Sequence, residues 1–170
     1  NPIEQDGTDP LPEAELDRFM MKVLIDYPEA VDEVQLVGAV TTGRVDDTLD
    51  VDAFDPLMTG EEVLALQRVA ANVLADEAVV AYAVDIVRST RDRVGIHQGA
   101  GPRASIALIR TARAVALLEA RDFVTPDDIK SVAKPVLRHR IQLSPDLEIE
   151  GSSTDDLLDA LLDDVEAPRA

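Results

Sequence analysis

The chain has 170 residues, 46% hydrophobic and only 3% aromatic, so it can form one domain, or a domain with part of a second, around an aliphatic core. Sixteen basic and 34 acidic residues give a net charge of −18, which opposes non-specific binding to nucleic acid or to an anionic membrane. The absence of cysteine excludes disulfides and thiolate zinc sites and is compatible with a reducing cytoplasm, and no apolar run approaches the roughly 20 residues of a membrane span.

The first third of the chain carries weak structural signals. Residues 12–19 predict a short helix, residues 22–25 a short strand, and residues 29–40 a helix with valines at helical spacing. From Thr41 to Pro56 the pattern gives way to Gly, Thr and aspartates, which resemble a calcium-binding loop only loosely. We expect a solvated acidic linker and a domain boundary in this stretch.

Helix start signals then recur at the intervals of a helical bundle. Thr59 and Glu62 form a capping-box pattern, and Pro102 and Pro126 each stand at the first position of a helix. The helix expected over residues 102–120 is apolar nearly all round, which predicts that it lies at the centre of the bundle. The helix expected over residues 154–165 has a leucine face that needs a partner surface within the chain or in another subunit. We expect helices over residues 59–75, 77–91, 102–120, 125–139 and 154–165, and an extended segment over 141–143.

Most catalytic templates fail on the residues available. The only histidines, His97 and His139, have no metal-ligand spacing, so no metal site is expected and each is more simply a surface or capping residue. No serine lies in a G-x-S-x-G context, and no G-x-x-x-x-G-K-[ST] phosphate loop occurs in these 170 residues. The sequence therefore predicts no hydrolytic centre built from its own residues alone.

A cationic band runs through the acidic chain and leaves two interpretations open. Between Ile86 and Gln142 the chain carries eleven Lys and Arg against five acids. The band either binds a local anion such as phosphate or pairs with the acidic flanks. Within it, the Gly-rich segment 95–101 leads into Pro102-Arg103, where a helix N-terminus and an arginine could hold a phosphate, although the same pattern also serves as a simple turn and helix start. The Asp17-Arg18 pair at a helix end is, on physical grounds alone, ordinary surface.

Several segments together resemble one family, in the same order and at similar spacing along nearly the whole chain. The chain resembles the C-terminal part of MoxR-type AAA+ ATPases, a bacterial chaperone-like group. The segments that carry the resemblance are Asn1 to Gln5, Leu11 to Phe19, Gly101 to Ser105, Arg121 to Asp128 and Val136 to Arg140. Any one of them alone would be a weak signal.

The resemblance implies a fold and a domain plan. The fold class is mainly α: a helical lid bundle of four to five helices preceded by a truncated remnant of an α/β AAA+ core with one short strand. The implied domains are the core remnant over residues 1–45, the acidic linker over 46–58 and the helical lid over 59–170. Because the chain begins at Asn1 without a Met start, we expect a fragment or processed product.

Three site residues follow from the resemblance, residue by residue. Asn1 matches the sensor-1 asparagine that orients the attacking water, Arg18 matches the arginine finger offered to a neighbouring subunit, and Arg103 matches the sensor-2 arginine that contacts the ATP γ-phosphate. The family's phosphate loop and Mg²⁺-binding acidic motif have no counterpart in this sequence. ATP and Mg²⁺ are thus expected in the complete protein, and this chain alone is expected to be inactive in hydrolysis.

The resemblance also implies partners, and a second class of function stays open. Expected partners are the other subunits of the same ATPase ring, usually a hexamer, and proteins with von Willebrand factor A domains. The expected role is nucleotide sensing and subunit contact in a cytoplasmic ATPase that remodels or matures partner proteins, without nucleic acid and without a membrane span. The alternative is a non-enzymatic acidic helical module that docks through its leucine-faced C-terminal helix.

Overall fold

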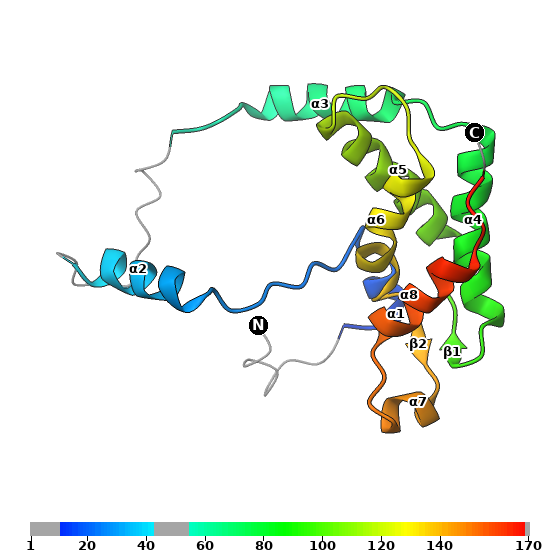
Figure 1. Ribbon diagram of the computed structural model, residues 1–170. Coiled ribbons are helices and arrows are strands. Elements are labelled where there is room, and N and C mark those ends of the chain that lie inside the picture. Colours follow the sequence, from blue (N-terminus) through cyan, green and yellow to red (C-terminus); the bar gives the residue numbers. More distant parts are fainter. Residues whose placement is uncertain (1–10, 43–54, 169–170) are drawn as a thin grey trace. The chain divides into compact units, whose positions relative to one another are not determined.

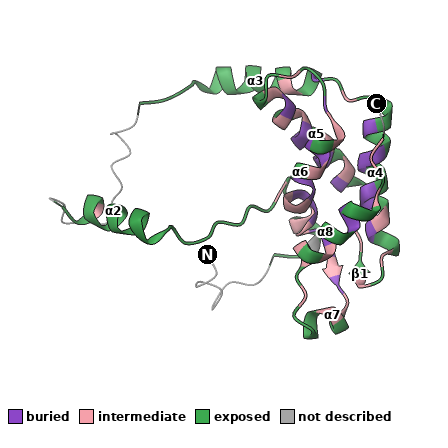
Figure 2. Cartoon of the chain, in the orientation of Figure 1, coloured by how far each residue is buried: buried purple, intermediate pink, exposed green. Residues whose placement is uncertain are grey.

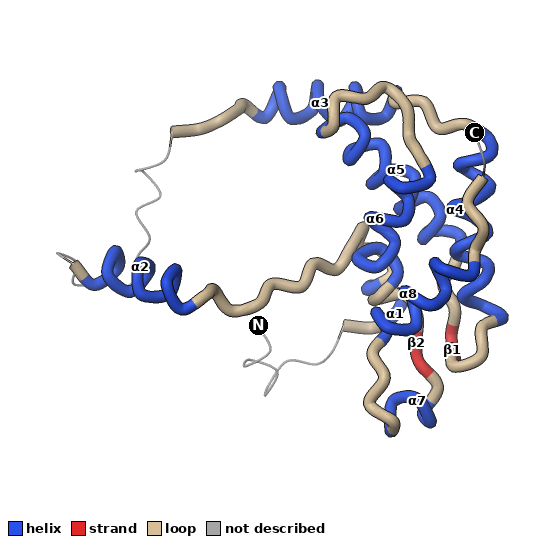
Figure 3. The backbone as a smooth tube through the Cα atoms, viewed as in Figure 1, coloured by secondary structure: helices blue, strands red, loops and turns tan. Residues whose placement is uncertain are grey.

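The computed structural model describes residues 11–42 and 55–168, and within these ranges the chain is mainly helical, as the sequence predicts (Figures 1 and 3). The elements in chain order are α1 (Glu13–Leu16), α2 (Ala30–Thr41), α3 (Gly60–Asn72), α4 (Glu77–Asp92), β1 (Ile96–Gln98), α5 (Pro102–Leu118), α6 (Pro126–Leu137), β2 (Gln142–Leu143), α7 (Pro145–Ile149) and α8 (Thr154–Asp164).

The described chain divides into two compact units. One holds the residues up to Lys22 together with those from Gln67 onward, and the other holds residues 23–66. In the second unit α2 forms where the valine spacing predicts it, but neither α2 nor α3 buries a side chain, and Val31, Val34 and Val37 are exposed. This unit therefore has no core of its own.

The first unit contains the aliphatic core. Helix α5 packs against α4 and α6, and α8 packs against α4 and α6. The purple residues in Figure 2 follow the inner faces of these helices. The largest fully buried side chains include Ile86 on α4, Leu108 on α5, Ile129 and Leu137 on α6, and Leu158 and Leu161 on α8.

The structure shows which faces of helices α5 and α8 are buried. Helix α5 does lie between α4 and α6, but only one side of it is buried: Ile106 is 53% exposed and Leu118 is 87% exposed. The leucine face of α8 finds its partner inside the chain, since Leu158, Leu161 and Leu162 are buried in the core of the first unit. The surface that an adaptor role for this helix would require is thus already occupied.

The sheet differs from the sequence expectation. Strand β2 forms at the segment predicted to be extended and pairs antiparallel with β1, which the sequence placed in a break. The strand expected over residues 22–25 is not formed. The amide of Lys22 instead donates to the Pro135 carbonyl oxygen at 2.8 Å, which ties it to the end of α6. The helix expected over 12–19 shortens to α1, and α7 was not expected.

Candidate functional site

Four arginines surround one cavity of the first unit. The cavity has a volume of about 330 Å³, and three segments far apart in the sequence line it: the turn after α1, the first half of α5 and the residues after α6. Among the residues that the structure describes, none that lines this cavity carries a carboxylate. The lining residues are Arg18, Met20, Arg103, Ile106, Ala107, Arg110 and Arg140. Such a concentration of guanidinium groups is suited to an anion with several oxygens.

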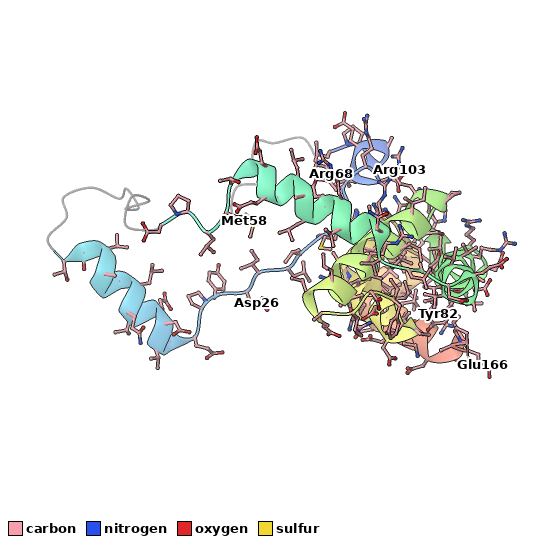
Figure 4. All side chains as sticks on the ribbon, turned by 90° about the horizontal axis from the view of Figure 1, so that it is seen from above. Asp26, Met58, Arg68, Tyr82, Arg103 and Glu166 are labelled. Carbon is pink, nitrogen blue, oxygen red and sulfur yellow. The ribbon has the colours of Figure 1, made fainter. Side chains whose placement is uncertain are left out.

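Arg103 reaches this cavity because α5 begins immediately before it. Gly101 caps the helix without a side-chain hydrogen bond, and Pro102 occupies the first position, where a missing amide is harmless. The side chain of Arg103 is 54% exposed, and its Nη1 lies 3.2 Å from Asp17 Oδ2. In Figure 4 Arg103 lies beside the short helix α1. The α5 N-terminus and Arg103 together place positive charge at the cavity.

Arg18 belongs to the turn that follows α1. The amide of Arg18 donates to the Glu15 carbonyl oxygen at 3.0 Å, and that of Phe19 donates to the Leu16 carbonyl oxygen at 3.1 Å, so the chain continues to turn after the helix ends. The Arg18 side chain is exposed and lines the cavity. Within the described ranges it pairs with no carboxylate, and the same holds for Arg110.

Arg140 is buried, and its guanidinium hydrogen-bonds to the turn that carries Arg18. Its side chain is 1% exposed, and Nε lies 3.2 Å from Asp17 Oδ1. Nη2 donates to the carbonyl oxygens of Asp17, at 3.1 Å, and Phe19, while Nη1 donates to those of Met20, at 3.1 Å, and Val136. Burial lowers the pKa of Arg140, and its hydrogen bond to Asp17 opposes that shift.

A second cavity adjoins the first, with a volume of about 420 Å³. Its lining is polar and Gly-rich: Ala14, Asp17, Gln98, Gly99, Gly101, His139, Arg140, Ile141 and Gln142. Nε2 of His139 lies 3.2 Å from the Phe19 carbonyl oxygen, and Nδ1 is buried without a hydrogen-bond partner in the described structure. Burial, followed by the charge of Arg140, lowers the pKa of His139. Arg140 lines both cavities, and Asp17, which lines the second, pairs with Arg103 of the first.

The structure brings two of the three predicted site residues together at one cavity. Arg18 and Arg103 line the same cavity, although they are 85 positions apart. Asn1 lies outside the described residues. Sequence reasoning missed Asp17, which is no surface decoration because both Arg103 and Arg140 pair with it, and it assigned no role to Arg140 or Arg110. The burial of Arg140 leaves no local sequence signal, since its partners lie 120 residues away.

The cationic band is largely neutralised by the acidic flanks. Six of its eleven basic residues form ion pairs among the described residues, and five of these six pair with acids from outside the band. These pairs are Arg93 with Asp164, Arg138 with Asp155, Lys134 with Asp159, and Arg103 and Arg140 with Asp17. Within the described residues Arg110 of the cavity has no carboxylate partner, and neither do Arg88, Arg91, Arg113 and Lys130 elsewhere in the band.

Residues 11–42 and 55–168 show neither a metal-site cluster nor a helix suited to crossing a membrane. No cluster of three or more His, Asp or Glu side chains in these ranges has the arrangement of a metal site. None of the helices in these ranges combines the length and the apolar character that crossing a membrane requires. The cavity arginines fit the phosphate chain of a nucleotide, whereas the described residues that line the cavity supply no carboxylate for Mg²⁺.

Comparison with known proteins identifies relatives. Residues 88–161 match the AAA lid domain family. Over 99% of its length the chain is 38% identical to the uncharacterized protein YeaC of Bacillus subtilis and 35% identical to chaperone MoxR1 of Mycobacterium tuberculosis, of which it covers 51% and 45%. Protein MoxR of Paracoccus denitrificans is 34% identical over 87% of the chain, which covers 48% of that relative. The chain thus spans about half the length of the curated relatives it matches.

A solved structure agrees with these relatives. The crystal structure of a candidate ATPase from Cytophaga hutchinsonii superposes with a TM-score of 0.86 at 34% identity, and it covers 99% of this chain and 52% of that one. The match to the AAA lid domain family begins within α4 and ends within α8. The chain belongs to the MoxR-type AAA+ ATPases and corresponds to the C-terminal part of its relatives, with an AAA lid domain.

Proposed function

We propose that this chain is the nucleotide-sensing and subunit-contact part of an ATPase that remodels or matures partner proteins. The single observation that carries the proposal is that Arg18 and Arg103, which match the family's arginine finger and sensor-2 arginine, line one cavity together with Arg110 and Arg140. We place the core remnant at residues 1–45, the linker at 46–58 and the lid at 59–170, in a cytoplasmic ring, usually of six subunits.

In this proposal the chain's own residues bind and orient phosphate oxygens. ATP with Mg²⁺ supplies the phosphoryl group that is transferred to water. Arg103 binds γ-phosphate oxygens at the start of α5, Arg18 neutralises charge that develops during transfer, and Asn1 orients the attacking water. Positioned positive charge lowers the barrier because phosphoryl transfer depends on electrostatic stabilisation more than on covalent chemistry. The phosphate loop that holds the nucleotide is not among these 170 residues, so we propose that the chain alone does not hydrolyse ATP.

The chaperone-like role rests on the relatives. A relative of this chain is named as a chaperone, and AAA+ proteins generally work as rings, which supports a ring that acts on other proteins. We propose proteins with von Willebrand factor A domains as partners. An adaptor role for α8 finds no support, because its leucines are buried in the chain's own core.

The test is ATP hydrolysis by the complete protein that carries these residues. We expect R18A and R103A each to lower kcat by about 10³-fold, because an arginine that stabilises transferred phosphate contributes on that scale. R88A is the matched control, since Arg88 is an exposed helical arginine outside the cavity, and it should leave turnover unchanged. Wild-type turnover in both R18A and R103A would overturn the proposed roles of these residues.

A further inference from the structure

We infer that Asp17 and Arg140 are positioning residues, which attach the turn bearing Arg18 to the lid and hold Arg103 at the same cavity. The inference rests on the proposed function and names residues that neither the family resemblance nor the comparisons assign. It is carried by the hydrogen-bond network between residues 17–22 and residues 135–140, which lie about 120 positions apart in the sequence.

Arg140 is the centre of this network. Its guanidinium reaches the Asp17 carboxylate and four backbone carbonyl oxygens, three of them in the turn at Asp17, Phe19 and Met20 and one at Val136 in the last turn of α6. A buried guanidinium with all its donor groups used fixes the geometry of its partners, because losing any of these bonds would leave a buried polar group unpaired. The turn is therefore fastened to α6 by side-chain bonds and does not depend on the four-residue helix α1.

Neighbouring contacts fasten the turn at further points. His139 Nε2 lies 3.2 Å from the Phe19 carbonyl oxygen, and the Lys22 amide donates to the Pro135 carbonyl oxygen at 2.8 Å. Arg138 Nη1 donates to the Lys22 carbonyl oxygen at 3.4 Å. These bonds hold residues 19–22, and the bond from Arg140 to the Asp17 carbonyl oxygen holds the residue before Arg18, so the backbone on both sides of Arg18 is tied to the end of α6. Arg18 consequently moves with the lid helices as one body.

Asp17 couples this attachment to Arg103. One carboxylate oxygen faces Arg140 Nε and the other faces Arg103 Nη1, each at 3.2 Å. The Asp17 side chain is 35% exposed and that of Arg103 is 54% exposed, so water and small anions reach this pair, whereas the Arg140 side chain is sealed at 1%. Arg103 is thus the exchangeable partner: a phosphate oxygen can replace Asp17 at Arg103 without disturbing Arg140.

Two opposite effects of Asp17 follow, and they distinguish positioning from support of the fold. Its negative charge competes with an anion for Arg103, so removing the charge strengthens anion binding. Its carboxylate also orients Arg103 and, through Arg140, the Arg18 turn, so removing it misplaces the cations that act in catalysis. A residue that only stabilised the fold would weaken binding and turnover together.

The first experiment measures tripolyphosphate binding to the 170-residue chain by calorimetry. We expect D17N to bind tripolyphosphate several-fold more tightly than the wild type, and E15Q to bind it as the wild type does. Glu15 is the matched control because it is an exposed acid on α1 that forms no ion pair with any described residue. Weaker binding of tripolyphosphate by D17N would overturn the competing role of Asp17.

The second experiment measures ATP hydrolysis by the complete protein with D17N and R140K. R140K keeps the charge but offers three donors to five acceptors. We expect both variants to lower kcat by about 10²-fold, the scale of a small misplacement, and D17N to leave KM unchanged or lower it. Wild-type kcat in D17N would overturn the positioning role.

The third experiment probes the clamp, by which we mean the hydrogen bonds from Arg140 to Asp17, Phe19 and Met20, and it tests this inference separately from the proposed function. In the ¹⁵N-arginine-labelled chain, the Nε–H of Arg140 should exchange with water far more slowly than that of exposed Arg88, and D17N should accelerate it. Equal exchange at both arginines would refute the clamp even if R18A and R103A abolished hydrolysis. Slow exchange at Arg140 with unaffected hydrolysis in R18A and R103A would leave the clamp standing and refute the proposed function.

Discussion

At the scale of single residues, Gly99 determines how the start of α5 sits on the end of α4. A Cβ at this position would lie 2.7 Å from the Thr90 carbonyl oxygen and 2.7 Å from Arg91 Cα, which are backbone atoms that cannot move aside. The close approach allows the Ala100 amide to donate to Thr90 Oγ1 at 2.9 Å and Arg91 Nε to donate to the Ala100 carbonyl oxygen at 3.0 Å. Gly99 therefore helps to place the helix start that carries Arg103.

We expect G99A to lower the free energy of unfolding by about 1–3 kcal/mol, the usual cost of forcing an atom into a packed site. Urea unfolding followed by circular dichroism gives the measurement. G101A is the matched control, because a Cβ at Gly101 meets nothing within 4 Å, and its midpoint should stay close to that of the wild type. Coinciding midpoints for G99A and G101A would show that α4 and the segment before α5 separate easily.

Single residues also mark the limit of what sequence reasoning could reach at the site. Arg18 and Arg103 could be predicted as candidate site residues because each stands in a local motif that resembles the family. Asp17 and Arg140 could not, because their importance comes from contacts across more than 120 positions and from burial of a guanidinium, which no local pattern encodes. The same holds for Gly99, whose constraint is set by atoms of α4.

At the scale of elements, helix starts were predictable because their determinants are local. Thr59 with Glu62 forms the capping-box bonds that the sequence indicates, and α5 and α6 begin at the expected prolines. The strands could not be predicted with equal success: β1 forms only because β2 lies beside it, and residues 22–25 form no strand although their composition favours one. Pairing between distant segments decides strands, whereas a helix satisfies most of its hydrogen bonds internally.

The start of α6 combines a cap with a buried ion pair, so Asp128 should be unusually costly to replace. Its carboxylate accepts from the Thr125 amide at 2.7 Å and from Arg121 Nη1 and Nη2 at 2.8 and 2.6 Å, and its side chain is 5% exposed. We expect D128A to lower the free energy of unfolding by about 2–4 kcal/mol, because it removes the cap and two charge-assisted hydrogen bonds and leaves Arg121 paired only with the exposed Glu119.

Urea unfolding of D128A and D127A checks this expectation. Asp127 is the exposed neighbour in the same helical turn, and its replacement should change stability by less than about 0.5 kcal/mol. The hydrogen bonds from Arg121 hold the pKa of Asp128 below its usual value. The stabilising effect of the pair is therefore present above about pH 4 and is lost as the pH falls through the lowered pKa. Equal stability of the two variants would mean that the pair contributes no more than surface charge.

At the scale of the whole molecule, ion pairs join the acidic segments to the cationic band, whereas aliphatic side chains form the core. Acids outside the cationic band pair with it and bring α8 and the turn after α1 onto the other helices of the first unit. The core itself is aliphatic, as composition predicts, and holds Tyr82 at 2% exposure. Because Tyr82 is the buried one of the two tyrosines, its near-ultraviolet circular dichroism reports unfolding of the first unit.

This signal can show how stability depends on pH through His139, whose pKa is lowered by burial and by Arg140. In the unfolded chain a histidine binds a proton near pH 6.5, whereas the folded chain keeps His139 neutral to lower pH. The unfolded state therefore binds more protons in this window, and the free energy of unfolding falls as pH decreases below about 6.5.

H139Q keeps a donor near the Phe19 carbonyl oxygen but cannot titrate. We expect the wild type to lose up to about 1 kcal/mol relative to H139Q between pH 7.5 and pH 5.5, and H97Q, at an exposed site, to follow the wild type. Parallel stability profiles for wild type and H139Q would show that protonated His139 is accommodated without cost beside Arg140.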